Sequence, residues 1–290
     1  MFSIFEVLPP PPPKILVVDV GAQNDPATLN PYEPLVRSGC ATVVGFEPLR
    51  PECDKLNAGA NPGRCYHPYA IGEGDSRTLR VCAYSAASSL YEPNTPLLAH
   101  FNNLEACLQV VDRIPLRTVR LDDIPQADHA DYLKLDAQGA EADVLRGALR
   151  VLEDTLVVYT EVEFIPLYQD QALFADVDAL LRAHGFLFHK FTECIGRAFQ
   201  PVVVNNDPDR GCSQLLWGNA VYVKSFLEFG RLSPQSLLKL AIILHEVHTS
   251  YDLCLLALRH HDTQTGTTLA PAYLERLIGA GPTAVPRTRI

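Results

Sequence analysis

The stretch KILVVDVG, residues 14–21, decides the fold class of this chain. It is an unbroken run of apolar, mostly β-branched residues that ends in Asp19, Val20 and Gly21. A strand that is apolar on both faces is typical of the centre of a parallel sheet. In such sheets the binding site lies just beyond the carboxyl ends of the strands. We therefore expect residues 14–21 to form a central strand whose end borders a site.

Three further apolar runs, 41–46, 132–135 and 156–160, are interpreted in the same way. Weaker strand patterns cover 65–71, 79–84, 186–192 and 214–223, and apolar residues at helical spacing occur in 140–153 and 171–184. Strands that alternate with helices of this length indicate βαβ units. The sequence thus predicts an α/β fold with a doubly wound, mainly parallel sheet.

The two ends of the chain differ from this central part. Residues 1–13 contain five consecutive prolines and predict an extended lead-in. Residues 14–230 carry the sheet pattern, and residues 231–290 predict a helical extension with a mobile end. Within that extension we expect a helix or helix pair over 234–259, then a largely mobile tail with one short helix near 271–278.

Composition excludes some classes of protein. The chain has 290 residues, 47% of them hydrophobic, and a formal net charge of −10, which disfavours a non-specific nucleic-acid binder. Its eight cysteines form no CxxC pair, as expected for buried thiols in a reducing compartment. The sequence shows no basic signal segment and no apolar stretch of membrane-spanning length. We expect a cytoplasmic protein without a membrane span.

Acidic residues end four of the predicted strands, which would place them along one edge of the sheet. The first loop reads DVGAQND rather than GxGxxG, so the glycines that cradle a pyrophosphate are missing. Gly21 permits close approach of a ligand, and an acidic residue such as Glu47 can bind both hydroxyls of a ribose. The pattern favours a positively charged nucleoside without phosphates, and S-adenosylmethionine fits that description. The acidic residues are Asp19, Glu47, Asp136, Glu161 and Glu163.

Several segments together resemble the FkbM-type methyltransferases. They are VVDVGA (17–22), VVGFEP (43–48), LDDI (121–124), DYLKLDAQGAEADVLRGA (131–148) and EVEF (161–164). The resemblance covers about 14–192 and is most specific in 131–148. It implies a seven-stranded class I methyltransferase fold, Rossmann-like, and S-adenosylmethionine as the cofactor.

The resemblance also implies roles for individual residues around the cofactor. It places Asp19, Gly21 and Ala22 around the methionine part, Glu47 with Pro48 at the ribose, Ala70 and Ile71 beside the adenine, and Asp136 next to the sulfonium and the acceptor. The first loop departs from the usual DVGANxG of the family. Gln23 replaces the asparagine, Asp25 stands at the second glycine, and residues 26–34 extend the loop.

Methyl transfer to a hydroxyl needs a base or a metal ion to deprotonate the acceptor. The hypothesis is that Asp136, or Glu161 or Glu163 through a divalent metal, activates a hydroxyl on a sugar or secondary metabolite. Glu161 and Glu163 share one strand face, where they could bind a metal, orient a hydroxyl or simply be solvated. Lys134 lies on the face of Asp136 and could hold that carboxylate ionised.

Two other functions stay open from the sequence. A binding module with a vestigial nucleoside pocket is compatible with the altered first loop, whereas an NAD-dependent dehydrogenase would need the missing glycine loop. The acceptor is expected to be a small molecule or a glycan, with its determinants in 91–115 and 192–262. The segment 234–259 could cover the pocket or form a homodimer face.

Overall fold

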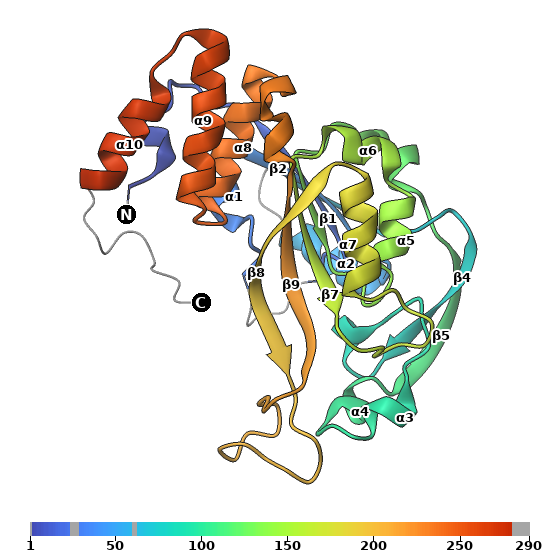
Figure 1. Ribbon diagram of the computed structural model, residues 1–290. Coiled ribbons are helices and arrows are strands. Elements are labelled where there is room, and N and C mark those ends of the chain that lie inside the picture. The colour runs from blue at the N-terminus through green and yellow to red at the C-terminus, as the bar shows by residue number, and fades with distance from the viewer. Residues whose placement is uncertain (1, 24–28, 60–62, 280–290) are drawn as a thin grey trace.

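The computed structural model describes residues 2–23, 29–59 and 63–279 (Figure 1). Seven strands form one sheet in the order β3-β2-β1-β6-β7-β9-β8, in which only β9 runs against the others. This confirms the expected doubly wound, mainly parallel, seven-stranded sheet. Its strands are β1 (Ile15–Val20), β2 (Ala41–Phe46), β3 (Arg64–His67), β6 (Tyr132–Leu135), β7 (Val157–Glu163), β8 (Phe186–Gly196) and β9 (Leu215–Lys224).

Helices cover both faces of this sheet, which is why its central strands are mainly apolar on both faces. Alternate residues of a strand point to opposite faces. Val18 and Leu133 therefore pack with α5 (Glu141–Arg146), α6 (Leu149–Asp154) and α7 (Phe174–Ala183), on the right in Figure 1. Val17 and Tyr132 pack on the other side with α1 (Glu33–Arg37), α8 (Pro234–Glu246) and α9 (Tyr251–Thr265). The helix α2 (Arg50–Ala58) connects β2 to β3.

The single helix predicted over 140–153 is wrong, because the chain forms two helices that separate near Gly147. A Cβ atom on Gly147 would lie 2.1 Å from the carbonyl oxygen of Gly72. The carbonyl of Gly147 also accepts a hydrogen bond from the N–H of Asp122 at 3.0 Å. A distant segment therefore packs onto the glycine and interrupts the helix between α5 and α6.

We expect Gly147→Ala to lower the free energy of unfolding by about 1–3 kcal/mol, because the new methyl group collides with backbone that cannot move freely. Gly59→Ala is the matched control, since its Cβ would lie no closer than 3.6 Å to its neighbours. Urea denaturation of both variants measures the difference. Equal stability of the two variants would contradict this account of the helix break.

A two-stranded antiparallel sheet stands beside the main one, formed by β4 (Ser76–Cys82) and β5 (Val110–Arg117). The strand predicted at 79–84 belongs to it, whereas β5 was not predicted. Most side chains of β5 are exposed, so its sequence VVDRIPLR carries no continuous apolar pattern. The short helices of this region are α3 (Thr95–Leu98) and α4 (Leu104–Cys107), with 3₁₀ turns η2 (Ser85–Ala87), η3 (Leu121–Asp123) and η4 (Pro125–Ala127).

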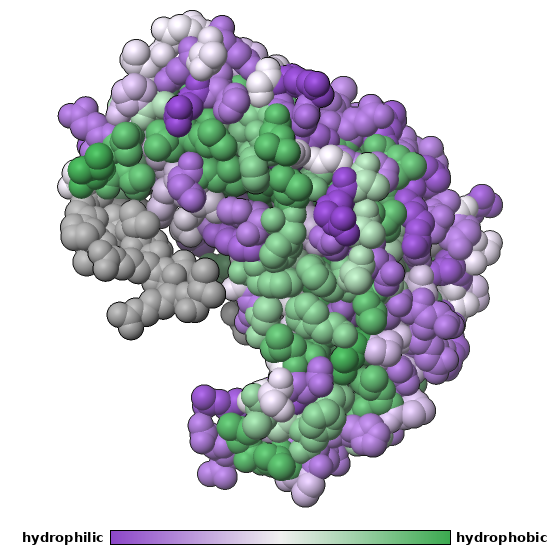
Figure 2. Space-filling model, in the orientation of Figure 1, coloured by the Kyte–Doolittle hydropathy of each residue, from purple (hydrophilic) through white to green (hydrophobic). Residues whose placement is uncertain are grey.

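The strands β8 and β9 form a long hairpin that projects beyond the other strands of the sheet (Figure 1). Figure 2 shows a concave outline between the C-terminal helices and the tip of this hairpin, with a band of apolar surface along β8 and β9. The hairpin therefore forms one border of this concave surface (Figure 2).

Beyond the sheet the chain is more ordered than the sequence suggested. The 3₁₀ turn η5 (Phe226–Arg231) leads into α8 and α9, the expected helix pair. The mobile tail predicted from residue 262 is wrong over 262–265, because α9 continues to Thr265, whereas the short helix predicted near 271–278 is confirmed by α10 (Leu269–Gly279). The phenol of Tyr273 is buried against His245, 2.8 Å from Nδ1, and this packing explains why α10 forms. Residues 280–290 lie outside the described residues.

The N-terminal segment packs on these helices rather than forming a separate extended arm. It begins with η1 (Ile4–Glu6), and Ile4 and Leu8 are buried in the core shared with α8 and α9. The N–H of Ile4 and the hydroxyl of Ser3 donate to Glu246 Oε1 at 2.9 and 2.7 Å. In the described ranges, no helix has the length and apolarity that crossing a membrane requires.

Candidate active site

Two cavities meet at the carboxyl ends of the parallel strands, where ligands bind in sheets of this kind. Asp136 and Gln138 line both cavities, together with Gln23 and Ala86. The first cavity is lined by residues that follow β1, β2 and β6, and by the β3–β4 loop, among them Gly21, Glu47, Pro48, Leu49, Ala70, Ile71 and Ala137. The second has a volume of about 610 Å³ and lies over β6, β7 and β9, with Lys134, Tyr159, Glu161, Trp217 and Asn219 in its wall.

The first cavity combines an apolar slot with one carboxyl group. Phe46, Ile71 and Leu79 supply the apolar wall. Glu47 is only 4% exposed, and its Oε1 accepts the N–H of Leu49 at 2.8 Å. Burial raises the pKa of Glu47 to about 7. This effect of burial is larger than the opposite effect of the hydrogen bond from Leu49, which lowers the pKa. Such a cavity suits a flat ring joined to a group that donates hydrogen bonds.

The loop after β1 is held tightly against the ends of β2 and β6. Gly21 has a φ of +73°, and a Cβ atom there would lie 1.8 Å from the carbonyl oxygen of Asp136. The N–H groups of Gly21 and Ala22 both donate to the carbonyl of Phe46 at 3.0 Å. Only glycine fits this close approach in a left-handed conformation.

The buried ammonium group of Lys134 is the positive charge at the centre of the candidate site. Its Nζ lies 3.1 Å from Asp19 Oδ1 and 3.6 Å from Asp136 Oδ2, and it donates to the carbonyl of Gly21 at 2.7 Å. Burial opposes ionisation of Asp136, but the charge of Lys134 and several hydrogen bonds outweigh it and lower its pKa. The predicted pairing of Lys134 with Asp136 is thereby confirmed.

Asp19 has a different position from the one expected. Its side chain is fully buried, where it pairs with Lys134 and accepts the hydroxyl of Tyr32 at 2.6 Å. Burial raises the pKa of Asp19, against the effect of Lys134 and Tyr32. Neither Asp19 nor Ala22 lines either of these two cavities. Direct contact of these two side chains with a ligand is therefore not supported, because neighbouring side chains and backbone cover them. Asp25 lies outside the described residues.

Gln138 connects the carboxylates of the two cavities, and sequence reasoning missed it. Its amide nitrogen donates to Asp136 Oδ1 at 2.8 Å and to Glu161 Oε2 at 3.0 Å, while its amide oxygen accepts the hydroxyl of Tyr168 at 3.1 Å. Burial and the negative charges of Asp136 and Glu163 raise the pKa of Glu161 well above its usual range. The two carboxyl groups that Gln138 joins thus differ: Asp136 is held ionised and Glu161 favours the protonated form.

Glu163 is not part of the group formed by Asp136, Gln138 and Glu161. It is 2% exposed and lines neither cavity, and burial beside Glu141 and Asp136 raises its pKa well above the usual range. Its expected direct role at the acceptor is therefore not supported. Within the described residues, no group of three or more His, Cys, Asp or Glu side chains is placed to hold a metal ion.

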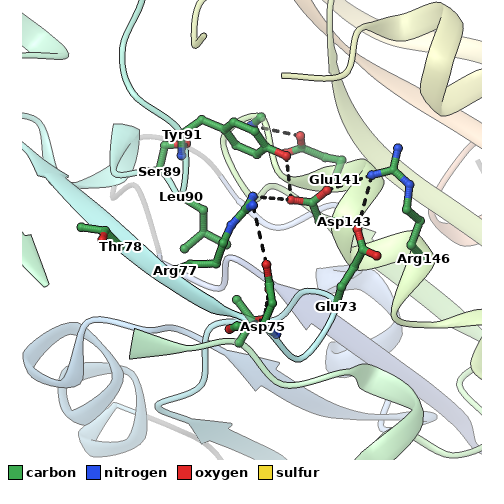
Figure 3. Close-up of polar contacts among 12 residues, drawn as sticks. Glu73, Asp75, Arg77, Thr78, Ser89, Leu90, Tyr91, Glu141, Asp143 and Arg146 are labelled. Carbon is green, nitrogen blue, oxygen red and sulfur yellow. Dashed lines mark hydrogen bonds and ion pairs between the residues drawn. The ribbon is translucent and has the colours of Figure 1, made fainter. Parts of the chain in front are cut away.

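Polar contacts fasten the outer wall of the first cavity to α5 (Figure 3). Asp143 Oδ2 accepts from the guanidinium of Arg77 and from the hydroxyl of Tyr91, both at 2.7 Å, and its Oδ1 accepts from Arg146 at 2.9 Å. Glu141 accepts the N–H groups of Ala137 and Gly139, so it holds the loop that follows Asp136. The wall and the loop are therefore positioned from the same helix.

The strand order, with a final reversed strand, is that of the class I methyltransferase fold. Residues 19–188 match the profile of the Methyltransferase FkbM domain, which is more than half of the chain. The chain therefore belongs to the FkbM family of S-adenosylmethionine-dependent methyltransferases, as the sequence motifs predicted. No curated protein gives a significant match.

Solved structures are similar only distantly. Magnesium protoporphyrin IX methyltransferase (ChlM) from Synechocystis PCC 6803, with bound SAM, is 11% identical; the match covers 73% of this chain and 71% of that one, with a TM-score of 0.38. A TehB-like SAM-dependent methyltransferase from Corynebacterium glutamicum is 11% identical over 77% and 85% of the two chains, with a TM-score of 0.35. The fold assignment rests on the strand order and the family match.

Proposed function

We propose that this protein transfers the methyl group of S-adenosylmethionine to a hydroxyl oxygen of a sugar or secondary metabolite. The observation that carries the proposal is the position of Asp136, an ionised carboxylate in the wall shared by both cavities. A group in that position can face a cationic cofactor on one side and a hydroxyl acceptor on the other.

The residues of the first cavity fit this cofactor. Its apolar slot, which includes Ala70 and Ile71, suits an adenine ring, and Glu47 can accept hydrogen bonds from the ribose hydroxyls. The negative charge of Asp136 favours the nearby sulfonium. When bound, S-adenosylmethionine supplies an electrophilic methyl group, so the protein needs only to align the acceptor and remove a proton.

The proton has a defined destination in this proposal. As the acceptor oxygen forms its bond to the methyl carbon, the carbon–sulfur bond would break with release of S-adenosylhomocysteine, and the acceptor oxygen loses its proton to Asp136, whose ionised form Lys134 stabilises. Gln138 lies between Asp136 and Glu161 and holds these two carboxyl groups in place relative to each other. The larger cavity supplies room for the rest of the acceptor.

Calorimetric titration of the purified protein with S-adenosylmethionine and with NAD tests the cofactor part of the proposal. We expect binding of S-adenosylmethionine alone. Binding of NAD alone would favour a dehydrogenase, and binding of neither would favour a module with a vestigial pocket. Methyl transfer from labelled S-adenosylmethionine to hydroxyl acceptors then tests the reaction.

Cofactor affinity should depend on pH through Glu47. Its pKa is about 7 in the free protein, and hydrogen bonds from ribose hydroxyls favour the ionised form, so affinity should rise with pH through 7 and level off above it. We expect Glu47→Gln to bind S-adenosylmethionine about 10-fold more weakly at pH 8 and to lose this pH dependence. Titrations from pH 6 to 8.5 measure both, and an unchanged pH profile in the variant would contradict the assignment.

A further inference from the structure

The floor of the second cavity is a row of polar side chains at one level of the sheet. In the strand register Glu161 of β7 lies opposite Asn219 of β9, and Asn219 lies opposite Glu193 of β8. Asp136 follows the end of β6, next to Glu161, and Gln138 joins these two carboxyl groups. All four members of the row line the cavity: Asp136, Glu161, Asn219 and Glu193.

This row extends well beyond the position where methyl transfer is proposed. Adjacent strands lie about 4.8 Å apart, so three strand spacings make a row of roughly 14 Å. That length exceeds one pyranose ring. Asn219 and Glu193 lie at the far end of the row from Asp136, on the β8–β9 hairpin.

An aromatic ring flanks the outer part of the row. Trp217 lies two residues before Asn219 on β9, hence on the same face, and it also lines the cavity. The guanidinium of Arg197 lies 5.4 Å from the centre of the Trp217 ring and is held at the hairpin by Asp209, whose carbonyl accepts from it at 2.5 Å. The indole is therefore fixed in place beside the polar row.

The charges of the cavity select against an anionic acceptor. Besides Glu161, which favours the neutral form, its wall contains the carboxyl groups of Asp136, Glu193 and Asp209. The two cationic side chains among its described lining residues, Lys134 and Arg197, already lie against acidic partners. Carboxylates and an amide accept hydrogen bonds from hydroxyl groups, and the part of the Trp217 indole that lines the cavity, away from Arg197, can pack on the apolar face of a sugar ring.

We infer that Trp217, Asn219 and Glu193 form an outer subsite for a second sugar ring, so that the methyl acceptor is an uncharged disaccharide or longer glycoside. This inference rests on the proposed hydroxyl methylation at Asp136 and adds the size and class of the acceptor. In this case the residues of the β8–β9 hairpin determine which acceptors are methylated, and the strands beneath the cofactor do not determine it.

Methyl transfer to matched acceptors tests the subsite. The probes are methyl glycosides of glucose, galactose, mannose, rhamnose and fucose, and disaccharides that carry each of these sugars at the non-reducing end. We expect a higher kcat/KM for a disaccharide than for its monosaccharide. Asn219→Ala and Glu193→Gln should each reduce that preference roughly 10-fold. Gln214→Ala is the matched control, because Gln214 is on the same hairpin but does not line this cavity, and it should leave the preference unchanged.

Saturation-transfer NMR with S-adenosylhomocysteine present gives a readout that does not need turnover, and the disaccharide signals should weaken in both variants. Unchanged preference in folded variants, or methylation of only non-saccharide alcohols and phenols, would overturn the subsite and leave hydroxyl methylation standing. If S-adenosylmethionine binds but no hydroxyl acceptor of any class is methylated, the proposed function itself fails.

Discussion

Asp136→Asn should reduce the rate of methyl transfer roughly 100- to 10,000-fold while S-adenosylmethionine still binds. The amide keeps the size of the side chain but cannot take a proton from the acceptor. The buried Lys134 retains Asp19 as its partner, so the fold should persist. Single-turnover methyl transfer and calorimetric titration measure the two effects separately.

Asp112→Asn on the exposed strand β5 provides the control for loss of one negative charge, and it should behave like the wild type. Full methyl transfer by the folded Asp136→Asn variant would remove Asp136 from the reaction.

Lys134→Met should lower the free energy of unfolding by about 3–5 kcal/mol, the usual cost of removing one partner of a buried ion pair. The substitution leaves the fully buried Asp19 carboxylate with the hydroxyl of Tyr32 as its remaining side-chain partner. It also removes the donor to the carbonyl of Gly21, which holds the loop after β1. Chemical denaturation at pH 7 measures the loss.

The loss should be smaller in acid. The pKa of Asp19 already lies above its ordinary value of 3.8 in the folded protein, and removal of Lys134 raises it further. A carboxyl group with a raised folded-state pKa costs no stability below that ordinary value and destabilises the fold increasingly as the pH rises above it. The variant should therefore be closer to wild type at pH 4 than at pH 7. Asp19→Asn combined with Lys134→Met should recover part of the loss, and a loss independent of both pH and Asp19 would contradict the ion-pair explanation.

The central strands could be predicted from sequence because they are buried on both faces, which leaves a continuous apolar run at each. The strand β5 could not, since it is exposed and pairs only with β4. The break between α5 and α6 depends on Gly72, which is 75 residues away along the chain from Gly147, and local helical spacing contains no sign of it.

The residues of the candidate site show the same limit of prediction from the sequence. Glu47 and Asp136 directly follow strands, and the structure places both in the first cavity. Asp19 lies within its strand, one residue before the end, so its side chain points to the face that Tyr32 covers. Gln138 carries no recognisable signal, because its role depends on a left-handed backbone conformation (φ of 51°) that aims its amide at two carboxylates.

The contact between the N-terminal segment and α8 has a consequence for biosynthesis. Ile4 and Glu246 are 242 residues apart, so the partner of Ile4 emerges from the ribosome only after 242 further residues have been synthesised. At about 5–20 residues per second, the apolar side chains of Ile4 and Leu8 remain without their partners for roughly 12 to 50 seconds. The sheet can begin to assemble during that time, but the core on its α8 side closes only after α8 and α9 have been synthesised.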